Sequence, residues 1–162
     1  MEEKIKSGIE KQLKAYNIDI AFLDTERPWG GFFVIEQKST TTFIEKYFQD
    51  VEVNNLGNGI LSPKILIVAP GKKLSWQYHL RREEIWKLIQ GEAGIVRSET
   101  NNQQAVEQMK MGETIYLKKN ERHRLVGMND WGIIAEIWKH TDPENPSDEN
   151  DIIRLQDDFG RD

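Results

Sequence analysis

Between Gly30 and His140 the chain is a succession of short segments rich in β-branched and aromatic residues, and this pattern constrains the fold most strongly. Glycine, proline or asparagine separates many of the segments, as at Pro70-Gly71, Gly91 and Gly112. About ten short strands in one domain are typical of a β-sandwich or a jelly roll. No helical pattern of normal length interrupts them, which argues against a doubly wound α/β fold. The predicted strands are GFFVIEQ, TFIEKYF, KILIVAP, LSWQYHL, EEIWKLI, AGIVRS, QAVEQM, ETIYL, HRLVG and GIIAEIWKH.

The two ends of the chain differ from this central region. In residues 2–16, Ile5, Ile9 and Leu13 recur every four residues between lysines and glutamates, which predicts an amphipathic helix on the outside of the domain or on a partner. At the other end, Asp151-Ile-Ile-Arg-Leu155 is a short apolar piece that we expect to dock on the barrel. The predicted organisation is therefore a helix and lead-in over 1–25, a β-barrel over 26–140 and an acidic segment over 141–162.

The formal charge of −5 over 162 residues is concentrated in the last segment. Thr141–Asp162 contains eight acids and two arginines, so it carries −6 and the rest of the chain carries +1. We interpret the segment as a solvated tail, with a dedicated acidic binding element as the other possibility. The acidic balance argues against general nucleic-acid binding.

The location of the protein is predicted from three negative features. The chain has no cysteine, which excludes disulfides and thiolate metal sites and suits a reducing compartment. Its longest apolar stretch, Ile65–Pro70, is too short to span a bilayer, and Met1-Glu-Glu-Lys4 does not begin a secretory signal. We therefore expect a cytoplasmic protein without membrane contact.

Basic residues gather in two windows of the body, and each window surrounds a histidine, His79 or His123. Such local positive charge predicts a small anionic ligand. The basic residues of the windows are Lys72, Lys73, Arg81, Arg82, Lys118, Lys119, Arg122 and Arg124.

The first window also predicts a metal site. If residues 74–80 form a strand, Gln77, His79 and Arg81 share one face, and a hairpin returns with Glu84 near its start. A strand around His123 adds a second imidazole. Gln77, His79, Glu84 and His123 would supply two nitrogens and two oxygens, which suits zinc, iron, manganese or nickel. Spacing alone leaves open that these histidines are only hydrogen-bonded structural residues.

Several motifs resemble those of the cupins. Gly71-x7-His79-x-Arg81-x2-Glu84-x6-Gly91 is similar to the first cupin motif, and Gly112-x10-His123 is similar to the second. Arg27-Pro-Trp-Gly30, the run from Lys64 to His79 and the closing run from Asp151 to Arg161 resemble one branch. That branch is the C-terminal cupin domain of type II mannose-6-phosphate isomerases, often fused to mannose-1-phosphate guanylyltransferases. The resemblance implies a single jelly-roll barrel (a double-stranded β-helix) and a homodimer.

Three positions depart from the family pattern Gln-x-His-x-His-Arg-x-Glu-His-Trp and the Pro-x-Gly turn that follows it. Arg81 and Ile85 replace two histidines, and Asn120 replaces the turn glycine, although asparagine also adopts the left-handed conformation. Two outcomes remain open. In the first, Gln77 completes a metal set like that of the type I isomerases; in the second, the Arg81 guanidinium occupies the cation position, repels a divalent ion and binds an anion.

The resemblance implies interconversion of mannose 6-phosphate and fructose 6-phosphate through an enediol. A divalent metal, with zinc favoured and manganese, iron, nickel or cobalt open, would polarise the carbonyl, and Arg81 is the weaker electrostatic substitute. We expect Lys73, Arg82 and Arg124 to bind the phosphate. The alternative is a cupin without catalysis that binds a sugar phosphate or a nucleotide sugar.

The base is predicted on the last long strand. Ile134, Glu136 and Trp138 share one face, whereas Ile133, Ala135 and Ile137 form an aliphatic face for packing against another layer. A carboxyl group beside a tryptophan in a barrel mouth acquires a raised pKa and becomes a usable base. The other interpretation is that Glu136 pairs with an arginine of the barrel.

Overall fold

The computed structural model describes residues 1–52, 56–57 and 59–161, so Asn58 of the predicted turn at 56–59 and Asp162 of the acidic segment lie outside the described residues. The described elements are α1 (Glu3–Ala15), β1 (Ile20–Arg27), β2 (Gly30–Ile35), the 3-10 helix η1 (Gln37–Ser39), α2 (Thr40–Tyr47), β3 (Leu61–Val68), β4 (Trp76–Tyr78), β5 (Arg82–Ser98), β6 (Glu107–Gln108), β7 (Thr114–Leu117), β8 (Arg122–His140) and β9 (Ile153–Gln156). None of the described helices is long and apolar enough to cross a membrane.

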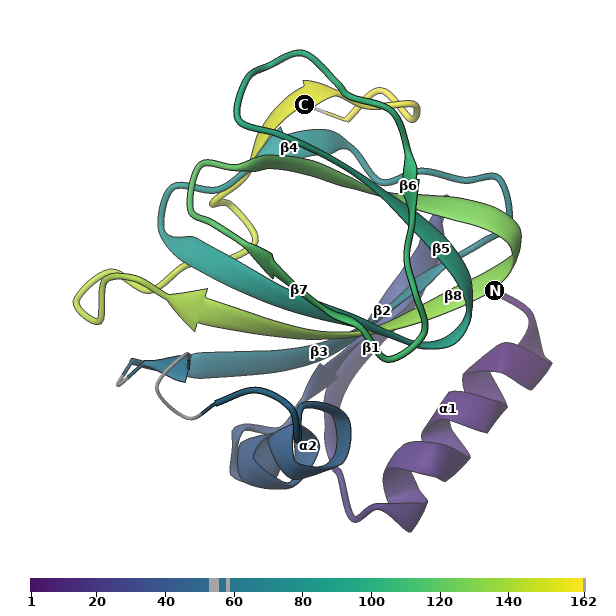
Figure 1. The fold of residues 1–162 in the computed structure, drawn as a ribbon. Helices are drawn as coiled ribbons and strands as arrows, with labels where there is room; N and C mark the ends of the chain where they lie inside the picture. Colours follow the sequence, from purple (N-terminus) through teal and green to yellow (C-terminus); the bar gives the residue numbers. More distant parts are fainter. Residues whose placement is uncertain (53–55, 58, 162) are drawn as a thin grey trace.

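The strands form one antiparallel sheet that curls into a barrel, and this confirms the predicted jelly roll (Figure 1). The main path is β1-β2-β3-β8-β4-β9, and β5 pairs with β6, β7 and β8. β5 and β8 are long because each joins two of the predicted strands, and they pair from Arg82 opposite His140 to Ser98 opposite Arg122. The ladder is irregular at Gly91, whose φ of 74° is open to glycine without strain.

Side chains alternate between the two surfaces of this curled sheet, as period-two strands require. On β8, Ile133, Ala135 and Ile137 belong to the core that packs against the helices, together with Phe33 and Ile65. Ile134 belongs to the second core, inside the barrel. The predicted faces of this strand are confirmed, so Glu136 and Trp138 lie inside the barrel with Ile134.

The helices cover one side of the barrel, away from β4 and the C-terminus (Figure 1). The predicted helix over 2–16 is confirmed by α1, whose Ile9 and Leu13 are buried. The prediction of a strand at TFIEKYF is wrong, because α2 occupies this segment. Phe43 and Tyr47, four residues apart, lie on one buried helical face and outweigh the strand-like composition. β1 begins at Ile20, so it crosses the predicted boundary at residue 25 between the lead-in and the barrel. The division of the chain into three regions stays a prediction.

The last segment returns across the barrel. β9 pairs with β4, with Arg154 opposite Gln77, and Arg124 of β8 forms an ion pair of 3.2 Å with Asp158. The turn before β8 has Asn120 at φ 70°, so asparagine does adopt the left-handed conformation expected in place of glycine. Together these contacts place residues 148–161 beside the strand ends that carry the histidines.

Candidate metal and substrate site

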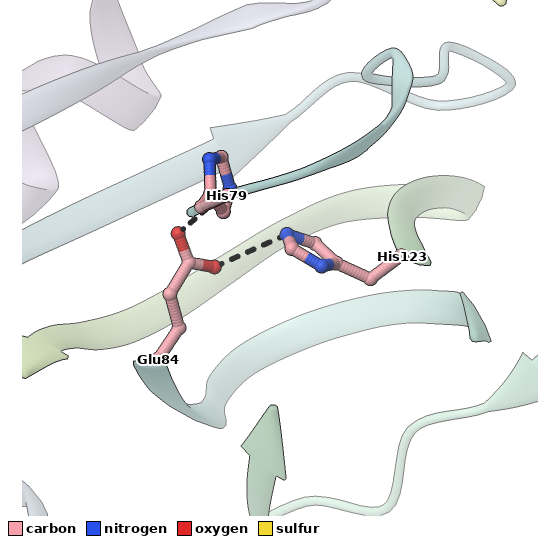
Figure 2. A group of neighbouring side chains, drawn as sticks. All are labelled: His79, Glu84 and His123. Carbon is pink, nitrogen blue, oxygen red and sulfur yellow. Dashed lines mark ion pairs between the residues drawn. The ribbon is translucent and has the colours of Figure 1, made fainter. Parts of the chain in front are cut away.

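Three side chains from separate elements meet at one end of the barrel interior. His79 follows β4, Glu84 lies on β5 and His123 lies on β8, opposite Gln77. Figure 2 shows the Glu84 carboxylate between the two imidazoles, with 3.3 Å from its Oε1 to His79 Nε2 and 3.3 Å from its Oε2 to His123 Nε2. All three residues are buried, and their ligand atoms lie within 4.8 Å of one another.

Hydrogen bonds fix the tautomer of both histidines. His79 Nδ1 donates to the Asp151 carbonyl at 2.7 Å, and His123 Nδ1 donates to the Glu121 carbonyl at 3.0 Å. Because a carbonyl only accepts, both Nδ1 atoms carry the proton, and in the neutral rings the lone pair is on Nε2, the nitrogen nearest Glu84. Burial lowers the pKa of His79, against the opposing effect of Glu84, and this also favours the neutral ring.

This donor set fits a divalent metal. Glu84 Oε2 and His123 Nε2 are buried and have no hydrogen-bond partner among the described residues, although they face each other. A divalent cation between the carboxylate and the Nε2 lone pairs of neutral rings would satisfy both, and a ring N–H bonded to a carbonyl is the usual support of a metal-bound histidine. The separations of 3.3 Å also agree with ligands about 2.1 Å from one tetrahedral ion.

Arg82 already supplies one positive charge to this group. Its Nε donates to Glu84 Oε1 at 2.9 Å, and its Nη2 donates to His79 Nε2 at 3.2 Å. Burial alone would raise the pKa of Glu84, but His79, Arg82 and His123 hold that pKa well below its usual value. Glu84 is therefore ionised, as a metal ligand would have to be, and Arg82 would share it with a metal.

Glu136 lies beside the group, between two indole rings. Trp86 Nε1 donates to Glu136 Oε2 at 2.7 Å, and Trp138 Nε1 donates to Oε1 at 2.9 Å. Burial and the nearby Glu84 carboxylate raise the pKa of Glu136 to about 8, although Lys64 and Arg82 oppose the rise. The predicted environment of Glu136, a carboxyl group beside tryptophan in a barrel mouth, is present.

These groups border a cavity of about 580 Å³ inside the barrel. Glu84, Glu136 and Arg82 line it, and Gln77 does so too, with its Oε1 accepting a bond of 2.5 Å from the Ser75 hydroxyl. Glu149, Asn150 and Arg154 of the last segment line its mouth. Of the histidine–glutamate group, Glu84 reaches the wall of this cavity, whereas His79 and His123 are not among its lining residues.

Lys64 and Glu149 line the cavity, but neither is among the site residues predicted from the sequence. Lys64 is buried on β3, lines the cavity and forms an ion pair of 2.6 Å with Glu149. The one available signal was a lysine in period-two alternation with Leu66 and Val68, a polar residue on an interior face. Glu149 gave no such signal, because only the path of the tail brings it to Lys64.

A family model described as "Mannose-6-phosphate isomerase C-terminal" matches residues 20–157. The chain belongs to this family. The mannose-6-phosphate isomerase C-terminal domain is a cupin, which agrees with the barrel and with the two histidine motifs. A search of curated proteins finds no match to this chain.

Solved cupin structures resemble this family member in fold. A mutant of oxalate decarboxylase from Bacillus subtilis aligns with TM-score 0.58 and 12% identity, over 83% of this chain and 30% of that structure. The capsular polysaccharide assembling protein CapF from Staphylococcus aureus aligns with TM-score 0.55 and 14% identity, over 83% and 32%. Vicilin from Solanum lycopersicum aligns with 0.54 and 16%, over 82% and 35%. The chain thus spans about a third of each, and at this identity the likeness concerns the fold alone.

The two residues that replace family histidines lie outside the histidine–glutamate group. Ile85 packs in the core beneath the helices, on the sheet surface opposite Glu84. Arg81 turns to the loop after β8, where its Nη1 donates to Asn145 Oδ1 at 2.7 Å and its Nη2 lies 3.3 Å from Asp148. The alternative in which the Arg81 guanidinium takes the cation position is therefore wrong. The neighbouring Arg82 is the arginine that contacts Glu84 and His79.

Two of the predicted phosphate ligands are also elsewhere. Arg124 is buried, but its Nε donates to the Leu74 carbonyl at 2.8 Å and its Nη2 pairs with Asp158. Lys73 forms a β-bridge with Val126 and does not line the cavity. Of the predicted anion ligands Lys73, Arg82 and Arg124, only Arg82 faces the cavity.

Proposed function

We propose that this protein is a sugar-phosphate isomerase that interconverts mannose 6-phosphate and fructose 6-phosphate with the help of a bound divalent metal. The observation that carries the proposal is the buried His79–Glu84–His123 group, with both Nε2 lone pairs and an ionised carboxylate facing one point beside a cavity. The family to which the chain belongs supports the choice of substrate. The cavity of about 580 Å³ has the size of a small-molecule site.

Each residue of the site has a distinct role in this proposal. In the proposal His79, Glu84 and His123 hold the metal, and Gln77 would add its amide oxygen in place of the bond that this atom accepts from Ser75. When bound, the metal supplies Lewis-acid polarisation of the substrate carbonyl. In its ionised form, which is populated as the pH approaches its pKa of about 8, Glu136 takes the proton from one carbon and returns it to the next, while its two indole donors keep the carboxyl group oriented. The tail over the cavity mouth reduces the access of water.

The experiment that tests the proposal combines metal analysis with an activity assay. The purified protein should contain about one equivalent of metal, zinc being the first candidate, and should convert mannose 6-phosphate to fructose 6-phosphate. His79→Ala and His123→Ala should abolish both, whereas His140→Ala, whose ring bonds to the Ser62 hydroxyl instead, should retain the metal. Absence of metal and of turnover with added zinc, manganese, cobalt or nickel would contradict the proposal.

One observation favours a second candidate, a cupin that binds a sugar phosphate or nucleotide sugar without catalysis. Arg82 donates to both Glu84 and His79, so a permanent cation already compensates the carboxylate. A protein of this kind would be stabilised by sugar phosphates in thermal unfolding without added metal and would show no turnover. No change of melting temperature with any common sugar phosphate or nucleotide sugar would count against it.

The remaining properties are proposals that follow from the family and the composition. We propose a cytoplasmic homodimer that takes a small sugar phosphate and no nucleic acid. Analytical ultracentrifugation of the purified chain measures the stoichiometry directly.

A further inference from the structure

The cavity is lined by a buried cation, Lys64, whose carboxylate partner is exposed. The Lys64 side chain is 7% exposed and its ammonium lies 3.5 Å from the ring centre of Trp138. Its carboxylate partner, Glu149, is 72% exposed and comes from the loop before β9, 85 residues away in sequence. One partner of this pair is therefore fixed in the barrel, whereas the other reaches in from the solvent side.

Other cations that line the cavity are paired differently. Arg27 pairs with Asp24 three residues away, Arg161 pairs with Asp157 four residues away, and Arg82 pairs with Glu84 on the same strand. Those acids belong to the same local segment as their base, so an incoming anion would have to compete with a neighbour held close by the chain. The Lys64–Glu149 pair lacks this local tether.

From these contacts we infer that Lys64 binds the anionic group of the ligand, and that Glu149 occupies the same position until the ligand displaces it. The inference deepens the proposed function and rests on it for the identity of the ligand as a sugar phosphate. A phosphate oxygen accepts the same charge-assisted hydrogen bond from an ammonium group as a carboxylate does, and it carries more negative charge. The ion pair seen here is then the closed form of the cavity mouth.

The sheet register supports this assignment. Lys64 on β3 lies opposite Glu136 on β8, and Trp86 on β5 lies opposite Glu136 from the other side. The strands that carry Lys64 and Glu84 are thus separated by one strand, which is roughly 10 Å. A ligand with its anion on Lys64 would extend its other end across Glu136 toward the histidine–glutamate group. The length of a hexose phosphate suits this span.

Direct titration with inorganic phosphate and with fructose 6-phosphate at low ionic strength tests the inference without requiring turnover. Lys64→Met keeps most of the buried side-chain stem and should weaken the binding of both about tenfold or more. Glu149→Gln removes the competing charge and should tighten both by about three- to tenfold. In the Lys64→Met background, Glu149→Gln should have no effect. Lys72→Met and Glu144→Gln, both at exposed positions outside the cavity lining, are the matched controls.

The outcomes separate this inference from the proposed function. Equal affinities of Glu149→Gln, Glu144→Gln and the unchanged protein overturn the inference, as does a gain from Glu149→Gln that persists without Lys64. Because Glu149 is exposed, its substitution tests the inference even if Lys64→Met fails to fold. Phosphate binding with the expected dependence but no isomerase activity would reject the function and keep the inference. Isomerase activity with an unchanged KM in Lys64→Met would keep the proposed function and reject the inference.

Discussion

The carboxyl group of Glu136 is buried between two indole donors, and its pKa of about 8 links it to the pH dependence of stability. The folded protein keeps the proton that the unfolded chain releases near the ordinary glutamate value. Folding stability should therefore be greatest at low pH with respect to this group and should fall as the pH rises from about 4.5 to about 8.

Glu136→Gln should remove this decline, because glutamine stays neutral. Urea unfolding of both proteins between pH 5 and 8 measures the difference. Glu107→Gln, at an exposed position of β6, should leave the slope as it is. Parallel slopes for Glu136→Gln and the unchanged protein would show that Glu136 does not hold its proton in the fold.

The neighbouring residues Arg81 and Arg82 make different contacts, and this predicts that only a substitution of Arg82 changes the metal affinity. Arg82→Gln frees Glu84 Oε1 and His79 Nε2 and removes a cation, so zinc affinity should rise by about tenfold, equivalent to about 1.4 kcal/mol. Arg81→His should leave zinc affinity unchanged, because the Arg81 side chain contacts the loop at Asn145 and Asp148. Competition with a chromophoric zinc chelator measures both. A gain in Arg81→His alone would place residue 81 at the metal after all.

At the residue scale, the sequence could predict ligands but not the positions of long basic side chains. Glu84 and His123 follow from motif spacing because the strands β5 and β8 fix their direction, and His79 follows directly after β4. Arg81 follows β4, where the strand alternation has ended, so its direction depends on the distant loop that it contacts. Lys64 was not predicted as a site residue, because its partner Glu149 becomes a neighbour only in the folded chain.

Among the elements, α1 contributes to the main core rather than resting on its surface. Leu13 is fully buried, in the same apolar cluster as Phe33 and Ile65 of the sheet. Leu13→Ala should lower the free energy of unfolding by about 2–5 kcal/mol. Ile5→Ala, at a partly buried position of the same helix, should cost less, and chemical denaturation compares the two. Equal small effects would mean that the helix is only loosely attached.

The segment before β9 is held by the side chain of Asp151. Its carboxylate accepts from the backbone N–H groups of Leu80 and Arg81, at 2.9 and 3.0 Å, and from the Ser147 hydroxyl at 2.6 Å. Asp151→Ala should cost about 2 kcal/mol in urea unfolding, because buried donors lose their acceptor. Glu144→Ala, exposed on the same loop, should cost nothing measurable. A stable Asp151→Ala variant would show that β9 and the ion pairs of the tail hold it without this carboxylate.

Element boundaries show where composition misleads. The segment TFIEKYF has the aromatic and β-branched content of a strand, yet α2 forms because Phe43 and Tyr47 bury one helical face against the sheet. The long strands β5 and β8 were each predicted as two, since Gly91 and the residues around Asn129 resemble strand ends. Pairing along the whole ladder carries the strands through these positions.

Considered as a whole molecule, the protein should be stabilised by the divalent metal that we propose for the histidine–glutamate group. The three ligands come from β5, β8 and the end of β4, so an ion would connect parts of the sheet that are far apart in sequence. At zinc concentrations about 100 times the dissociation constant, the expected gain is about 2.7 kcal/mol, or roughly 5–10 °C in melting temperature. Calorimetry with zinc and with a chelator measures this gain. His123→Ala should show none, and an equal gain there would place the ion elsewhere.

The hydrogen bond from His79 to the Asp151 carbonyl connects the histidine–glutamate group with the returning tail. Its acceptor is a main-chain atom. Any residue type at position 151 supplies the same oxygen, provided that the backbone keeps its path. The coupling between tail and imidazole is thus encoded in chain geometry, independent of side-chain identity. Point substitutions will rarely expose it, whereas a one-residue insertion or deletion between Pro146 and Asp151 would rotate the carbonyl away and release the ring.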